Sequence, residues 1–208
     1  MISFRIPTFS IPTVCLALLL VCPDVSGQEE GVSKGAIGKA LRSPNSLIRH
    51  DTWTKMNPEE KSQFSMLVKI MAKLPWFDRD GTIKALATAA SDEVLEKMIK
   101  GLKKNKDRAV RQGMAVALAK MDDPIFYKHL YEALDDKDPT VRRVVVHSLR
   151  VHKKPEAVDA LVKRFQKEDD PVVKTFLESS LNELTQAYRG PKAEYWLSWW
   201  ETAKNDPD

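Results

Sequence analysis

The chain has little cysteine and little glycine. Both of its 2 cysteines, Cys15 and Cys22, lie near the amino terminus, in a segment that we expect to be removed. A mature chain without cysteine has no disulfide, no cysteine-ligated metal and no cysteine nucleophile. Only 8 glycines occur in 208 residues, and valine and alanine follow helical spacing rather than strand alternation. With 30% charged residues, too many for a membrane-embedded chain, this composition predicts an all-α protein.

The chain also lacks an apolar run long enough to cross a membrane. Residues 11–22 are uncharged and mostly apolar, but the stretch is shorter than the roughly 20 residues that a spanning helix needs. Small residues follow at positions 25–27. The sequence therefore predicts a secretory signal over residues 1–27 and an exported protein, periplasmic or secreted. The alternatives are a buried amino-terminal helix, a retained anchor, or a lipoprotein at Cys22, which the size of Val21 disfavours.

No recognisable catalytic constellation occurs in the sequence. None of the 4 histidines belongs to a His-Glu-x-x-His zinc motif, and none is directly followed by glutamate. A Gly-x-Ser-x-Gly elbow and a phosphate-binding glycine loop are also absent. We therefore expect no enzymatic activity, no cofactor and no metal. The net charge of +4 is too mild to indicate nucleic acid by itself, and export argues against DNA.

What the sequence does contain is a repeated helix start. An aspartate is followed by Ile or Val three positions later and by Lys or Arg four positions later. The four motifs are Asp80/Ile83/Lys84, Asp107/Val110/Arg111, Asp138/Val141/Arg142 and Asp170/Val173/Lys174. Aspartate at a helix N-cap accepts a backbone N–H. The basic residue can pair with its own aspartate or with that of the next unit, so we predict a ladder that fixes the register between units.

Each motif is followed by a second helical pattern. These second patterns begin near residues 91, 123, 155 and 190. A single helical hairpin cannot bury its apolar face, so neighbouring hairpins must stack into an α-solenoid. We place this array at residues 56–205, with a first helix that starts at Asn57 and Pro58 and ends at Pro75. Residues 28–55 show little periodicity and are expected to form a loose lead-in with one short helix.

The motif from Asp138 to Arg143, followed by a valine-rich helix and a second helix, resembles the HEAT-like repeats named after phycobilisome lyases. The repeats begin near residues 80, 107, 138 and 170, and their spacing is shorter than the roughly 40 residues of full HEAT or armadillo units. The resemblance implies a HEAT/armadillo-like solenoid. It does not imply one function, because this fold hosts scaffolds, lyases, hydroxylases and DNA glycosylases.

The carboxyl-terminal segment is similar to the closing cap of exported bacterial HEAT-repeat proteins. It carries Leu184-Thr185-Gln186 and then Trp196, Trp199 and Trp200. Gln186 stands where those proteins often have glycine, which puts their turn geometry in doubt here. We expect the tryptophans to cover the open end of the stack, where a terminal unit has no neighbour. The alternative is that they hold a ligand such as a sugar ring.

Two sets of residues are candidates for contacts with a partner. If the valines of the 138–150 helix face inward, a basic stripe of four residues faces outward at helical steps: Arg143, His147, Arg150 and Lys154. A second basic cluster comprises Lys97, Lys100, Lys103, Lys104, Lys106 and Arg108. Tyr127 and Tyr131 lie one turn apart on a second helix, and second helices commonly line the concave face of such stacks. The alternative for the basic residues is an ordinary solvated surface.

From these features we predict a non-enzymatic scaffold or adaptor that binds a protein partner outside the cytoplasm. The partner is expected to be acidic if the basic residues contact it, and the chain to be monomeric, without a membrane span once the signal is cleaved. Two alternatives remain open. One is a lyase-like or chromophore-handling HEAT protein, and the other is a binder of an anionic polymer through the basic helix faces.

Overall fold

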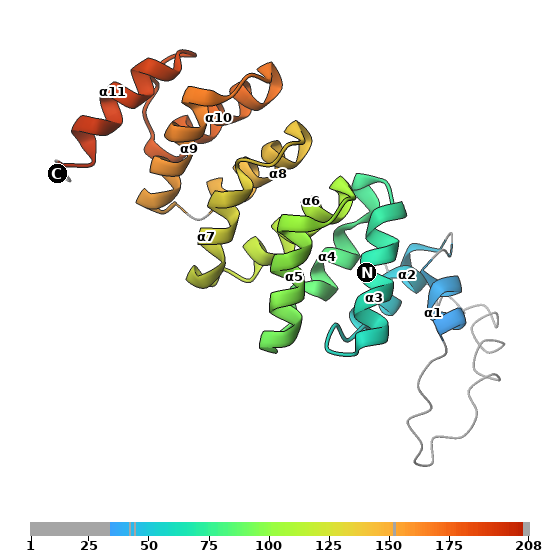
Figure 1. Ribbon diagram of the computed structural model, residues 1–208. Coiled ribbons are helices and arrows are strands. Elements are labelled where there is room, and N and C mark those ends of the chain that lie inside the picture. Colours follow the sequence, from blue (N-terminus) through green and yellow to red (C-terminus); the bar gives the residue numbers. More distant parts are fainter. Residues whose placement is uncertain (1–33, 42, 44, 152, 206–208) are drawn as a thin grey trace, which may run out of the picture.

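The computed structural model describes residues 34–205 except 42, 44 and 152. This part of the chain consists of eleven α-helices and one 3-10 helix and contains no strand (Figure 1). The all-α prediction is therefore confirmed. The predicted signal segment, residues 1–27, lies outside the described residues.

The repeated aspartate motifs each lie at the start of the first helix of a hairpin. These first helices are α4 (Asp80–Leu86), α6 (Arg108–Lys120), α8 (Pro139–Arg150) and α10 (Pro171–Thr185). The second helices are α5 (Asp92–Lys104), α7 (Pro124–Ala133), α9 (Pro155–Lys167) and α11 (Ala193–Ala203). Along the array α4 packs on α6, α6 on α8 and α8 on α10. One continuous apolar core, from Leu41 to Trp196, runs through the stack, as the solenoid prediction requires.

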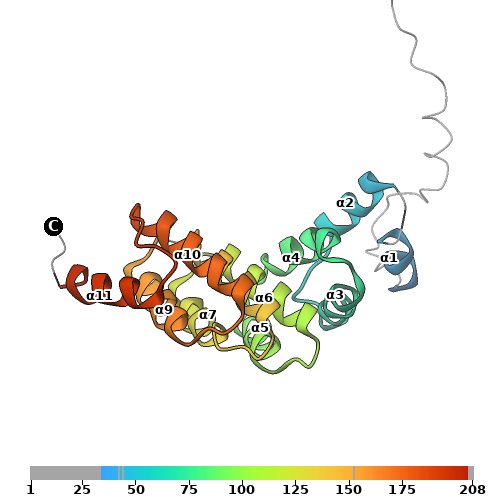
Figure 2. The same ribbon diagram turned by 90° about the horizontal axis from the view of Figure 1, so that it is seen from above.

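The two rows of helices are spaced differently. First helices α6, α8 and α10 pack closely on one another, whereas α9 packs on α10 and α11 but stands apart from α7. The array therefore bends toward the first helices, and α5, α7 and α9 lie on the outer side of the bend (Figure 2). The expectation that second helices line the concave face is wrong for this part of the array, because valine-rich α8 brings the first helices closest together.

The amino-terminal part is more helical than the sequence indicated. Its elements are α1 (Lys34–Ala40), α2 (Ser46–Thr54), α3 (Lys61–Lys73) and the 3-10 helix η2 (Trp76–Asp78). The lead-in thus contains two helices where the sequence indicated one. Helix α2 is capped by Asn45, whose side chain accepts the Leu47 N–H at 2.9 Å. It buries only Trp53, and a single buried residue leaves no periodic pattern to detect.

Helix α3 begins three residues later than predicted, with Glu60 rather than Asn57 at its N-cap. The side chain of Asn57 accepts the N–H of Glu59 at 3.0 Å and closes a turn before the helix. The carboxylate of Glu59 accepts the Ala90 N–H at 2.7 Å and the Ser91 N–H at 3.2 Å. Glu59 therefore ties the start of α3 to the start of α5, and it does not act within its own helix.

Three of the four repeat aspartates cap their helices. Asp107, Asp138 and Asp170 accept the N–H two positions ahead at 2.8–2.9 Å. Asp80 does not cap α4, because the N-cap position is occupied by Arg79. Instead the carboxylate of Asp80 pairs with Lys84 at 2.6 Å on the exposed helix surface.

Arg111 and Arg142 form the ladder, but their acidic partners differ from the motif aspartates predicted, whereas Lys84 pairs with its own motif aspartate. Arg111 binds the carboxylate of Asp136 at 2.6 and 2.9 Å, and Arg142 binds that of Glu168 at 2.8 and 2.6 Å. Each acid lies two residues before the next capping aspartate, whose own N–H it accepts. Nη1 of each arginine also donates to a backbone carbonyl of its own loop, Arg111 to Asn105 and Arg142 to Asp136. Lys174 is exposed and has no such partner in the described part of the chain.

Glu168 is the most enclosed member of this ladder. Its side chain has no exposed surface and also accepts hydrogen bonds from Arg164 and from the Asp170 N–H. Burial by itself would raise the pKa of Glu168. The hydrogen bonds from Arg142 and Asp170 and the charges of Arg164 and Arg142 outweigh it and lower the pKa from 4.5 to about 2.

Because this pKa is lower in the folded chain, the contribution of Glu168 to stability is present above about pH 4.5 and is lost as the pH falls toward 2. Glu168→Gln leaves Arg142 buried without a counter-charge. We expect it to lower the free energy of unfolding by about 3 kcal/mol at neutral pH. The difference from wild type should shrink as the pH falls, since protonated Glu168 resembles glutamine. Urea unfolding across this pH range measures it.

The matched control is Glu183→Gln, which removes an exposed partner of Arg150. It should change the free energy of unfolding by no more than about 0.5 kcal/mol at any pH. A destabilisation by Glu168→Gln that stays constant with pH would contradict the charged role of Glu168.

Candidate interaction site

A hollow of about 630 Å³ opens on the outer side of the bend, between α7 and the start of α9. It exists because these two second helices stand apart while the first helices beneath them pack closely. Its lining residues come from one face of α7 and from the first turn of α9: Pro124, Tyr127, Lys128, Tyr131, Glu132, Lys154 and Glu156. We call this site the α7–α9 hollow.

Two tyrosines line its α7 side. The rings of Tyr127 and Tyr131 are stacked, with centroids 6.4 Å apart and an interplanar angle of 29°. The hydroxyl of Tyr127 donates to the carboxylate of Asp122. Burial, followed by this hydrogen bond, raises the pKa of Tyr127 to about 12, so its hydroxyl keeps its proton at neutral pH. The stack is thus a fixed, uncharged aromatic surface.

The charged groups around the hollow are unequally neutralised. Glu132 is paired with Nζ of Lys103 at 2.5 Å, and hydrogen bonding to Lys103 lowers the pKa of Glu132. Lys128 and Lys154 are exposed, and within the described residues neither ammonium forms an ion pair. The hollow therefore offers two uncompensated cations and one uncompensated acid, Glu156.

The predicted basic stripe is divided by the structure. The guanidinium of Arg143 lies 5.4 Å from the centroid of the Phe176 ring, and Arg150 pairs with Glu183 at 2.9 Å. Both contacts are with α10, while His147 on the same helix is exposed. Lys154 does not continue the stripe, because Lys153 adopts φ 44° and turns the chain into α9. It joins Tyr127 and Tyr131 in the hollow instead.

The second basic cluster is half neutralised. Lys97 pairs with Glu93 at 2.5 Å and Arg108 with Asp138 at 3.6 Å, and Lys103 pairs with Glu132 as described above. The other three lysines, at positions 100, 104 and 106, have no ion pair with any residue that the structure describes. Screening further weakens such scattered surface charge.

The tryptophans lie on α11, the last helix of the array. Trp196 is completely buried and donates its indole N–H to the Gly190 carbonyl at 3.0 Å. The indole N–H of Trp200 donates to the Asp159 carboxylate at 3.0 Å, which ties α11 to α9. Trp199 is half-buried between them, in edge contact with Trp196. Gln186 adopts φ 54° without being glycine, so the turn before α11 keeps a left-handed residue.

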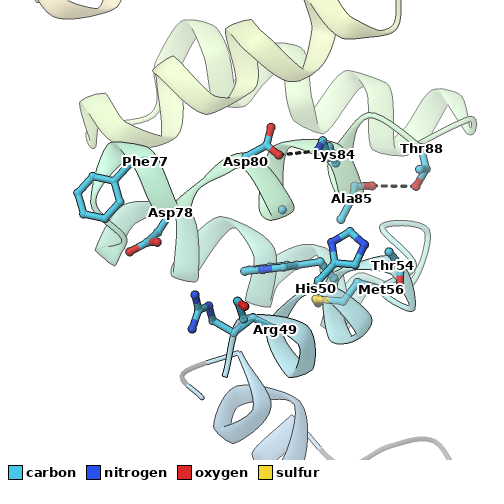
Figure 3. A pocket seen from close by; sticks show the side chains of 13 residues that line it. Arg49, His50, Thr54, Met56, Phe77, Asp78, Asp80, Lys84, Ala85 and Thr88 are labelled. Carbon is cyan, nitrogen blue, oxygen red and sulfur yellow. Dashed lines mark hydrogen bonds and ion pairs between the residues drawn. The ribbon is translucent and has the colours of Figure 1, made fainter. Parts of the chain in front are cut away.

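A second hollow, of about 410 Å³, lies between α2 and α4 at the amino-terminal end of the array (Figure 3). Arg49 and His50 line its α2 side, while Asp78 and Asp80 line the opposite side. Trp53 forms part of its lining. Sequence reasoning missed this site because its α2 lining residues fall in the aperiodic lead-in.

The described residues do not bring together a metal-binding group. Within them, no three His, Cys, Asp or Glu side chains are placed to hold a metal ion. His50 makes no hydrogen bond to a carboxylate in this part of the chain. No helix there is long and apolar enough to cross a membrane.

The lining of the amino-terminal hollow depends on Gly81. A Cβ atom at Gly81 would lie 2.2 Å from Cδ1 of Trp53. Gly81→Ala should therefore displace the rigid indole and lower the free energy of unfolding by about 1–3 kcal/mol. Gly101→Ala is the control, because its Cβ would meet the flexible Met114 side chain at 3.2 Å. It should be neutral or stabilising by up to about 1 kcal/mol. Thermal unfolding compares the two, and equal effects would contradict the steric argument.

A family model of HEAT repeats matches residues 65–150 and 127–182. The two matches overlap and together cover every helix from α4 to α9 completely. No curated protein matches the sequence of the chain. HEAT repeats are stacked helical hairpins whose extended surfaces typically serve as interaction scaffolds. With more than half of its residues matched and with the stacked hairpins described above, the chain belongs to the HEAT repeat family.

Proposed function

We propose that this HEAT-repeat chain is an exported, non-enzymatic scaffold that binds a protein partner in the α7–α9 hollow. Export rests on the signal-like residues 1–27 of the sequence. The binding role rests on one observation above the others. The hollow combines a fixed pair of tyrosine rings with two ammonium groups that pair with no carboxylate in the described structure.

This combination has the properties of a protein-binding hot spot. Tyrosine supplies a large contact area at a small cost in side-chain entropy and is enriched at the centres of interfaces. The Tyr127 ring is ordered by its hydrogen bond to Asp122 and by burial, and the Tyr131 ring is stacked on it. Little side-chain entropy would therefore be lost when a partner binds, and preorganisation of this kind increases affinity.

The basic surfaces support binding to an anionic polymer less well. Arg150 is held by Glu183 and Arg108 by Asp138, and Arg143 lies against the Phe176 ring. Polymer binding by counterion release needs many free cations along one track. The uncompensated cations described above are dispersed over α5, α7 and the start of α9. No observation favours chromophore handling.

Site-specific photocrosslinking tests the location of the binding surface. A photoreactive amino acid that replaces Tyr131 or Lys128 should capture a protein partner when the full-length chain is produced in its native cells. The same amino acid in place of Lys174 or Thr175, exposed on α10, is the matched control and should capture none. Capture from the α10 positions alone would contradict the proposal.

Mass spectrometry of the exported protein tests the leader. The mature chain should begin at Gln28, and Cys22→Ser should leave this processing unchanged. A chain that begins at a lipidated Cys22, and whose processing fails in Cys22→Ser, would show a lipoprotein instead. A chain found unprocessed inside the cell would contradict export.

A further inference from the structure

Lys154 occupies the N-cap position of α9, a position at which the second helices α5 and α7 have a capping side chain. Ser91 and Asp123 precede α5 and α7, and each side chain accepts a backbone N–H of its helix. A lysine at the same place before α9 accepts none, and it brings a positive charge to the positive end of the helix dipole. Lys192 before α11 also lacks a cap, but its ammonium lies 5.5 Å from the centroid of the Tyr195 ring. Among the described residues, Lys154 has no such contact.

The loops that lead into α7 and α9 are both held in unfavourable backbone conformations. Asp122 adopts φ 51° and Lys153 adopts φ 44°, a region that side-chain-bearing residues rarely enter. Asp122 orients Tyr127 through its hydroxyl, and Lys153 directs the chain so that Lys154 lies in the hollow. Local strain and a missing cap occur together before α9 and also before α11, where Gln186 adopts φ 54° and Lys192 is the N-cap. Only before α9 does the uncapped lysine line the α7–α9 hollow, and departures from local preference of this kind can mark a functional site.

The dimensions of the hollow favour an extended occupant. Its volume of about 630 Å³ is that of a site for a small ligand or a few residues, and a helix with side chains is about 10 Å across. Tyr127 is buried and its ring is stacked on that of Tyr131, which is only partly buried. A bound segment would therefore reach the aromatic stack at Tyr131.

The charges that line the hollow determine which charge the bound segment should carry. Lys128 and Lys154 are the uncompensated cations of the hollow, on its α7 side and its α9 side. A segment with carboxylates would neutralise both, whereas a basic segment would meet only Glu156. Proline suits the tyrosine surface, because its ring is flat and apolar and it brings no backbone N–H that needs a partner.

We propose that the α7–α9 hollow binds an extended, acidic, proline-containing segment of the partner, with Tyr131 contacting its prolines and Lys128 and Lys154 its carboxylates. This inference rests on the proposed function and specifies the chemistry of the bound segment. Lys154 has been placed at the start of α9 for binding and lowers the stability of the free chain.

Three synthetic peptides test the chemistry: alternating glutamate and proline, alternating lysine and proline, and alternating glutamate and serine. Backbone amide chemical shifts of the mature chain report where each binds. The glutamate–proline peptide should shift amides of α7 and the first turn of α9, and the other two should bind at least about fivefold more weakly. Equal binding of the glutamate–proline and lysine–proline peptides would overturn the acidic requirement.

Variants separate the contributions of the side chains. Tyr131→Ala should weaken binding of the glutamate–proline peptide about tenfold or more. Lys128→Ala and Lys154→Ser should each weaken it about two- to fivefold. Lys174→Ala removes an exposed lysine outside the hollow and should leave the affinity unchanged.

Lys154→Ser has a second readout that a purely structural lysine would not give. Serine restores a capping side chain and removes the repelled charge, so the variant should have a higher melting temperature while its affinity for the peptide falls. A fall in both quantities would overturn the proposed role of Lys154.

Failure of this inference can be told apart from failure of the proposed function. If photocrosslinks form at Tyr131 but none of the three peptides shifts an amide of the hollow, the acidic proline segment is wrong and the binding surface stands. If no crosslink forms at the hollow and one forms on α10, the surface itself is wrong.

Discussion

The array depends on one recurring interaction, a buried arginine that joins two successive loops. Arg111 and Arg142 each take a carbonyl from their own loop and a carboxylate from the next. Each carboxylate in turn fixes the N–H of the aspartate that caps the following helix. Each arginine thus fixes its own loop, the start of the following first helix and the position of the neighbouring unit at the same time. Apolar packing supplies the driving force for stacking, but it is not directional, and these bidentate contacts set how far each hairpin is turned relative to the last.

Where the ladder is present, the first helices are held close, and the second helices must accommodate the resulting bend. The α7–α9 hollow is therefore a product of the ladder rather than of the residues that line it. The same geometry explains why the basic residues of α8 are engaged by α10 through Phe176 and Glu183, whereas those beside the hollow remain unpaired. The close packing of the first helices and the exposed lysines beside the hollow thus both follow from the bend of the array.

The sequence predicts the parts of this structure that depend on local rules. The caps at Asp107, Asp138 and Asp170 follow from side-chain chemistry at helix starts, and the family follows from their recurrence. The acidic ends of the ladder were not predictable, because Asp136 and Glu168 lie in loops with other acids and only the stacking angle selects them. Helix α2 was missed because it buries one residue. Lys154 was predicted to continue the basic stripe of α8. Because Lys153 adopts a left-handed conformation, Lys154 lies in the α7–α9 hollow instead.

The splayed second helices also give the array a mechanical property. The first helices α6, α8 and α10 pack closely, whereas α7 and α9 stand apart on the other side of the array. A segment that bridges Lys128 and Lys154 would fix the angle between α7 and α9. Any change of this angle would be carried along the stack as a displacement of its ends. Occupancy of one small hollow would then influence the distance between α2 and α11, and with it the reach of the whole array.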